Sequence, residues 1–312
     1  MPPSPDDRRL GLTWAFAAAL GGAGFVIPWK LANEVGEPDL SAVIMLAAAA
    51  AANSLLVLAH RMRRGALRSP PLGTAVAVAA ALATFTLLGN LASARAIHSL
   101  SPALLNVLLR AEVILVALVA WVFLGERVER RFWIGAALAM VGLFLLQDRG
   151  SDDPNASPIG AGTGMALAAA ACFSGLAVLT RRFIHRIDPV LVNALRLWFA
   201  VALWFPFHTL PRWEAIPRAQ IGWAVTAAML GPFASRLCLM LSARHVEART
   251  TTLVNLTSPV MTVPLAWALL SDLPRLHQLI GGAVMMAGIA VPLLPFRSRD
   301  RARGEPDPHA SA

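Results

Sequence analysis

The chain has 312 residues, of which 57% are apolar and only 14% are charged. A soluble domain carries about 25% charged residues, so this composition argues against a soluble globular protein and predicts one that lies in a lipid bilayer. The formal net charge of +9 comes from basic residues spread along the chain rather than from one patch, so no nucleic-acid partner is expected.

Apolar stretches of about 20 residues, each long enough to cross a hydrocarbon core of roughly 30 Å, recur along the chain. Divided at charged residues and prolines, the sequence predicts ten membrane-spanning helices. Their ranges are 10–30, 39–60, 72–94, 102–124, 132–147, 160–180, 189–208, 219–243, 250–270 and 277–296. The first range is longer than the roughly 7–15-residue core of a signal peptide, so we expect a retained helix there.

Residues 120–142 resemble residues 266–288 without a gap. Eight of the 23 aligned positions are identical, and the Trp, Met and Gly matches are not those expected by chance in a chain rich in Ala and Leu. The pairs include Trp121 with Trp267, Gly135 with Gly281, and Gly142 with Gly288. The sequence therefore predicts a duplicated membrane unit, with the two matched tryptophans packed in its core.

A polar, turn-rich stretch in the middle of the chain separates five predicted spans from five others. We expect a five-helix repeat in 1–147, an outside (periplasmic) linker in 148–159, a second five-helix repeat in 160–296 and a disordered cytoplasmic tail in 297–312. An odd number of spans per unit inverts the second copy in the membrane. The predicted fold is all-α and integral to the membrane, with ten transmembrane helices as two inverted five-helix repeats.

Lysine and arginine are distributed unevenly between the two sets of loops. Eighteen lie at the termini and in the even-numbered loops, against six in the odd-numbered loops. Because cytoplasmic segments carry an excess of Lys and Arg, both termini are expected in the cytoplasm. The expected location is a bacterial-type cytoplasmic (inner) membrane, with membrane lipid as a partner.

At the repeated residues the chain resembles the EamA-like branch of the drug/metabolite transporter superfamily. That family's signature is an apolar helix ending in Leu-Gly-Glu, a polar turn, and a helix with an Ile-Gly and a second Gly. The first copy carries it as Leu124-Gly125-Glu126, Ile134-Gly135 and Gly142, whereas the second copy departs from it with Ser271-Asp272. The resemblance implies a transporter with efflux as its direction, but it does not identify the substrate.

Charged side chains inside membrane spans are expensive, so they face the bundle interior or a wet cavity. The candidates for substrate binding or coupling are Arg110 and Glu112 in span four, Arg196 in span seven and Arg236 in span eight, with Asn106 one turn before Arg110. Arg110 lies roughly 12 Å along its helix, near the midplane. Arg110 and Glu112 are about 200° apart on a helix, so they cannot easily pair with each other.

An excess of arginine at the midplane predicts a positive cavity for an anionic or zwitterionic substrate. Glu112 is then a proton-coupling or cation-recognising carboxylate. The alternative is a fixed ion pair between Glu112 and Arg196 or Arg236 that only clamps helices.

Span nine contains a Thr257-Ser258-Pro259 break. Span four has Arg110-Ala111-Glu112 at the positions of Leu256-Thr257-Ser258, so the first copy has lost the usual proline break and gained two charges. Asn255 could line the transport path near the break, and Pro259 and Pro264 are candidates for gating or hinge residues, with passive kinks as the alternative. Lys30, at the end of span one, is interpreted as a snorkelling lysine rather than a gate.

The sequence shows no metal-ligand spacing, P-loop, nucleophile elbow or dinucleotide fingerprint, so no metal, cofactor or catalytic residue is expected. It predicts a secondary transporter, and not an enzyme, that exports a small polar or amphipathic metabolite or drug by alternating access, as a single chain or a homodimer. Proton coupling would run through Glu112. The alternative is an integral-membrane enzyme acting on a lipid or isoprenoid, which needs acids clustered at one interface, whereas Glu126 and Asp272 are expected on opposite faces.

Overall fold

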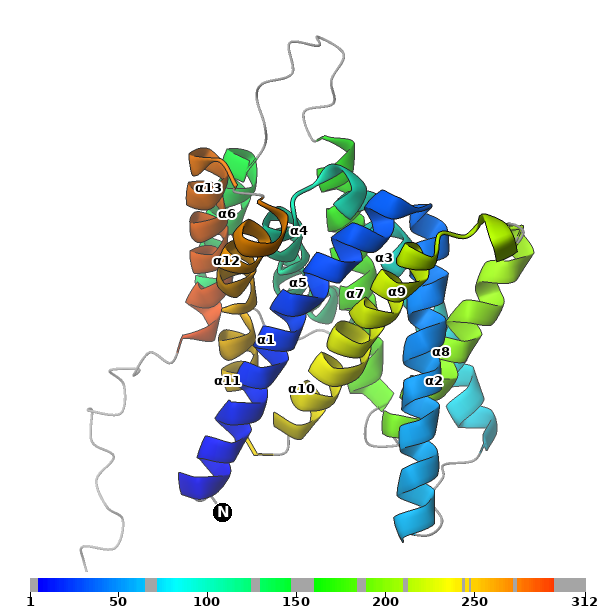
Figure 1. Ribbon diagram of the computed structural model, residues 1–312. Coiled ribbons are helices and arrows are strands. Elements are labelled where there is room, and N and C mark those ends of the chain that lie inside the picture. Colours follow the sequence, from blue (N-terminus) through cyan, green and yellow to red (C-terminus); the bar gives the residue numbers. More distant parts are fainter. Residues whose placement is uncertain are drawn as a thin grey trace, which may run out of the picture.

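The computed structural model describes residues 5–64, 72–124, 130–146, 160–183, 189–209, 213–242, 245–246, 248–271 and 274–294. Within these ranges the chain is helical with short connections and has no strand (Figure 1). The expected linker (148–159) and tail (297–312), together with Glu126 and Asp272, lie outside the described residues.

Helices follow one another along the whole described chain. The first half contains α1 (Pro5–Val35), α2 (Pro38–Arg64), α3 (Leu72–Ser99), α4 (Pro102–Leu109), α5 (Ala111–Leu124) and α6 (Arg130–Leu146). The second half contains α7 (Ala161–Phe183), α8 (Pro189–Trp204), α9 (Arg218–Ala228), the π-helix η4 (Met229–Ser235), α10 (Arg236–Ser242), α11 (Ala248–Asn255), α12 (Ser258–Leu270) and α13 (Leu276–Ala290). Short 3-10 turns are η2 (Phe205–Phe207), η3 (Trp213–Ala215) and η5 (Val291–Leu293).

Seven of the described stretches are long and apolar enough to cross a membrane. They are Asp7–Val35, Pro38–Ala59, Val76–Ser99, Pro102–Val119, Ala161–Thr180, Thr250–Leu270 and Leu276–Leu293. The three other expected spans, at 132–147, 189–208 and 219–243, are largely helical, as α6, α8 and α9–η4–α10. The number of ten crossings therefore stays a prediction.

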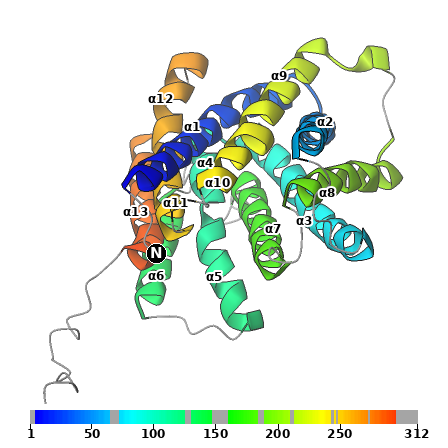
Figure 2. The same cartoon turned by 90° about the horizontal axis from the view of Figure 1, so that it is seen from below.

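The two halves pack through matching contacts. From the second half, α9, η4 and α10 pack along α1 of the first half. In the corresponding way, α3 of the first half packs along α7 of the second half. The contact of α2 with α9 likewise corresponds to that of α3 with α8. Viewed along the helices, α6 and α13 lie together on one side of the molecule, and α2, α3 and α8 lie on the other (Figure 2).

The equivalent helices α6 and α13 cross at the glycines of the sequence repeat. A Cβ added to Gly135 would lie 2.5 Å from the carbonyl oxygen of Gly288, and one added to Gly142 would lie 2.7 Å from that of Gly281. Conversely, a Cβ added to Gly288 would lie 2.6 Å from the carbonyl oxygen of Gly135, and one added to Gly281 would lie 2.9 Å from that of Gly142. Small residues let membrane helices approach this closely. Because the order of contacts is reversed, α6 and α13 run antiparallel, as inverted copies require.

Span four lacks the proline of span nine but is still interrupted, at Arg110. α4 ends at Leu109, α5 begins at Ala111, and the backbone N–H of Arg110 donates to the carbonyl of Val107 at 3.0 Å. Arg110 corresponds to Leu256 in the repeat, where α11 gives way to α12. Arg110 lies at the C-terminus of α4, and Glu112 lies in the first turn of α5. Both charges are favourable there, because a helix dipole is negative at the C-terminus and positive at the N-terminus.

The matched tryptophans do not lie in the core, contrary to expectation. Trp121 is 45% exposed and Trp267 is 58% exposed. Both are therefore surface residues of helices that the composition places in lipid, where a large apolar side chain meets acyl chains rather than water.

Candidate functional site

A polar cavity of about 230 Å³ lies between the two halves. Its walls come from α1, α2, α3, both sides of the break in span four, α7, α8, η4, α10 and α11. All six polar residues predicted from the sequence line it: Asn106, Arg110, Glu112, Arg196, Arg236 and Asn255. The fold thus brings residues from five separate helices to one place, although it does not by itself assign their roles.

Arg110 is held by a contact between the two halves. Its guanidinium donates to Asn106 Oδ1 at 3.1 Å, and Asn106 Nδ2 donates to Ser258 Oγ at 3.0 Å and to Thr262 Oγ1 at 2.6 Å. Ser258 and Thr262 belong to α12, beyond the break in the second copy. The two interrupted helices are therefore linked through Asn106, and this link orients Arg110.

Two charged groups of the cavity make no hydrogen bond or ion pair with the described part of the chain. They are the carboxylate of Glu112, on which the charges of Arg110 and Arg236 act from a distance, and the guanidinium of Arg236. In addition, Nε of Arg110 is buried without a hydrogen-bond partner. Among the described residues the fixed ion pair considered for Glu112 is therefore not formed, and several polar atoms are left to interact with a guest.

Arg196 differs from Arg236 because neighbouring helices hold it firmly. Its Nε donates to Asn193 Oδ1 and its Nη1 to Thr86 Oγ1, both at 2.8 Å, and Asn193 Nδ2 donates to Asn53 Oδ1 at 2.9 Å. Arg196 is only 8% exposed. It supplies a fixed positive charge at the cavity wall. The sequence reasoning missed its partners, although a polar residue in an apolar span is itself a signal of an interhelical hydrogen bond.

Aromatic and aliphatic side chains cover another part of the cavity. They include Phe25 of α1, and Phe173 and Leu176 of α7. The sequence reasoning did not single them out, because nothing distinguishes them from other apolar residues of their spans. With three arginines, one glutamate and these rings, the lining suits a small molecule with both a charged and an apolar part.

Pro259 and Pro264 do not reach the polar cavity. They line a separate apolar groove of about 310 Å³ on the far side of α4. Their suggested hinge role is not tested by this placement. Among the described residues no group of three His, Cys, Asp or Glu side chains is close enough to hold a metal ion.

Polar contacts tie α1 to α3 at the end of the molecule where α1 ends. Lys30 Nζ donates to the carbonyl oxygens of Ile97 at 2.9 Å and Leu100 at 3.1 Å and lies 3.2 Å from Glu34. Its side chain is only 13% exposed. The interpretation of Lys30 as a snorkelling lysine is therefore wrong, since the ammonium turns inward to satisfy carbonyls that the end of α3 leaves without helix partners.

The same end is also tied by α2. Asp39 accepts hydrogen bonds from Arg95 of α3 at 3.0 and 2.6 Å and lies 3.3 Å from His208 Nε2. Gln220 of α9, which is fully buried, donates to the carbonyl of Glu37 at 2.9 Å and to Ser41 Oγ at 2.8 Å. Both halves of the chain are thus joined at this end by hydrogen bonds.

Comparison with known proteins gives a family and a fold. The profile of the EamA-like transporter family matches residues 9–147 and, a second time, residues 160–294. A solved structure described as "Crystal structure of protein" is similar over 90% of this chain and 95% of its own, with a TM-score of 0.61 and 21% sequence identity; at that identity the likeness shows the fold alone. No curated protein matches.

Proposed function

The chain belongs to the EamA-like transporter family, and we propose that it is a secondary transporter that exports a small polar or amphipathic metabolite or drug by alternating access. The observation that carries this function is the cavity between the halves, which brings charged and amide side chains from five helices together. Inverted repeats with a substrate site near the midplane, formed by interrupted helices, are typical of secondary transporters. Both α4–α5 and α11–α12 are interrupted in this way.

The charges of the lining indicate an anionic or zwitterionic substrate. Arg110 keeps a buried Nε without a partner, and Arg236 is not paired within the described chain. A bound anion would satisfy both groups, since leaving a buried donor unsatisfied costs about 1–3 kcal/mol. The rings of Phe25 and Phe173 are available for an apolar part of the same molecule.

Glu112 is the residue we assign to coupling. An intramembrane carboxylate is a functional candidate by default, and Glu112 lines the cavity together with Arg110 and Arg236. Protonation of Glu112 would change the charge that the substrate meets, and this links substrate binding to a proton gradient.

The membrane topology we propose has ten crossings with both termini in the cytoplasm of a bacterial-type cell. The end closed by Lys30, Asp39 and Gln220 then faces outward, because it belongs to the loops poor in Lys and Arg. Alternating access would require these hydrogen bonds to break when the site opens outward.

The test begins with a thermal-shift screen of organic anions, zwitterions and cations against the purified protein at two pH values, since a ligand of the folded state raises apparent stability. The best hit is then used in counterflow with liposomes. We expect Arg110→Ala to abolish saturable counterflow and Glu112→Gln to abolish accumulation driven by a pH gradient. Arg218→Ala, which removes an exposed charge outside the cavity, should change neither.

Transport that survives both Arg110→Ala and Glu112→Gln would show that this cavity is not the transport site. Hits that are exclusively cations would contradict the positive cavity. A lipid product formed by the purified protein would favour an enzyme instead.

A further inference from the structure

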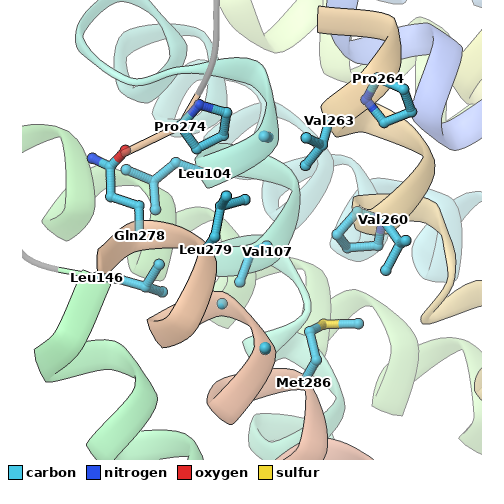
Figure 3. A pocket seen from close by; sticks show the side chains of 14 residues that line it. Leu104, Val107, Leu146, Val260, Val263, Pro264, Pro274, Gln278, Leu279 and Met286 are labelled. Carbon is cyan, nitrogen blue, oxygen red and sulfur yellow. The ribbon is translucent and has the colours of Figure 1, made fainter. Parts of the chain in front are cut away.

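The apolar groove of about 310 Å³ is formed by one face of α4, by α12 and by α13 as far as Met286, with Leu146 of α6 beside them (Figure 3). Leu104 and Val107 of α4 face it, whereas Asn106 and Arg110 line the polar cavity. Among the described residues that line this groove, Gln278 alone has a polar side chain. Two chemically different spaces thus lie on two faces of the same short helix.

The groove opens towards the outside of the bundle at membrane depth. Val260 is 68% exposed and Leu279 is 41% exposed, and both line it. Apart from Leu146 and Pro274, its lining belongs to stretches long and apolar enough to cross a membrane, Pro102–Val119, Thr250–Leu270 and Leu276–Leu293. At that depth no water is at hand to fill an apolar space, so the medium next to the groove is hydrocarbon.

The repeat shows what occupies the corresponding place in the first half. Trp133 of α6, which corresponds to Leu279, packs edge to face against Trp121 of α5, with ring centroids 5.5 Å apart. Trp267 corresponds to Trp121, but Leu279 offers it no ring. The first half thus pairs two aromatic rings at these positions, whereas the second half has one ring, Trp267, and the smaller Leu279.

Gly282 contributes to the opening and is not explained by packing of the protein itself. A Cβ added there would meet nothing closer than Val107 Cγ2 at 3.6 Å, whereas one added to the neighbouring Gly281 would lie 2.8 Å from a backbone nitrogen of α6. Gly in a helix interior costs about 1 kcal/mol relative to Ala. The first copy has Ala136 at the corresponding position. Gly282 therefore keeps space free in the groove at a cost in helix stability.

From these features we propose that the groove binds one acyl chain of a membrane lipid. The polar end of the lipid would lie near Pro274 and Gln278, where α13 begins, and the chain would run along the groove towards Met286. Gln278 is fixed at that end, since its Oε1 accepts the backbone N–H of Arg275 at 3.0 Å. The bound chain would contact Pro259 beside the break of span nine and so support α12 where its backbone is interrupted.

The full chain is reconstituted in phosphatidylcholine nanodiscs that contain a small fraction of phosphatidylcholine with a diazirine near the end of one acyl chain. After irradiation, labelled residues are located by peptide mass spectrometry. We expect the label to concentrate on Val107 and Met286, which are partly buried in the groove, above the level at Ile280, which is 49% exposed outside it. Gly282→Leu should remove the groove label and leave that at Ile280.

The control is Ala136→Leu, the same change at the corresponding position of the first half, which should leave the groove label in place. Labelling that follows exposure alone, with Ile280 above Val107 and Met286 in the wild-type chain, would overturn the assignment without any variant. So would a groove label that persists in a folded Gly282→Leu protein. A groove that is unlabelled because a second copy of the chain covers it, seen as a cross-linked dimer, would also overturn it.

Discussion

Replacing Gly281 or Gly282 by alanine should change stability in opposite directions, although the two residues are neighbours in α13. Both changes give the same gain in intrinsic helix propensity, about 1 kcal/mol. They differ in what the new Cβ meets. At Gly281 it would lie 2.8 Å from the backbone nitrogen of Leu146 and 2.9 Å from the carbonyl oxygen of Gly142, whereas at Gly282 the nearest atom is 3.6 Å away.

The loss of stability in Gly281→Ala depends on how far the rigid backbones of α6 and α13 must move apart. An ordinary contact begins near 3.4 Å, so Gly281→Ala requires α6 and α13 to separate by about 0.5 Å, and a gap of that size weakens each contact along the crossing by a quarter or more. Overpacking of this kind costs about 1–3 kcal/mol. Gly282→Ala needs no displacement and should stabilise the protein by up to about 1 kcal/mol.

The assay is the free energy of unfolding of the purified protein in mixed micelles titrated with sodium dodecyl sulfate, followed by helical circular dichroism. Gly142→Ala, on the other side of the same crossing, should behave like Gly281→Ala. If Gly281→Ala stabilises the protein as much as Gly282→Ala does, the close crossing of α6 and α13 is not what these glycines provide.

Three further changes test contacts around the cavity. Asn106→Leu removes three hydrogen bonds, each worth about 0.6 kcal/mol in a membrane, and should lower the unfolding free energy by roughly 2 kcal/mol; an unchanged value would mean that Arg110 is not held through Asn106. Thr86→Val removes one acceptor of the buried Arg196 and should cost about 1–3 kcal/mol, measured by the same titration, whereas Thr86→Ser should retain most of the stability. Lys30→Met should raise amide hydrogen exchange at the end of α3, and exchange equal to the wild type would show that the lysine does not secure that end.

The sequence was sufficient to predict the family, the helical fold and six of the polar residues that line the cavity. The repeated glycines survive in both copies because two backbones meet there, and that constraint is visible without coordinates. Arg110, Glu112, Arg196 and Arg236 stand out because charge in an apolar span needs a polar environment, and such environments are few in one bundle. Their convergence in one cavity follows from that scarcity.

Other features depend on three-dimensional contacts that no spacing encodes. The break at Arg110 has no proline to mark it, and the link from Asn106 to α12 beside it joins residues that are far apart in the sequence. The same holds for Lys30, whose ammonium turns inward only because the end of α3 lies beside it. Pro259 and Pro264 are hinge candidates by sequence, and nothing in the sequence indicates that they line the apolar groove rather than the polar cavity.

The reciprocal crossing of Gly135 on Gly288 and Gly142 on Gly281 has a consequence for how such a chain can diversify. In a dimer of two separate identical halves, every substitution would appear on both sides of the crossing at once. Covalent linkage removes that restriction, because each copy can vary while the four glycines still set the distance between α6 and α13. One gene can therefore hold a charged break in one copy and an open groove in the other.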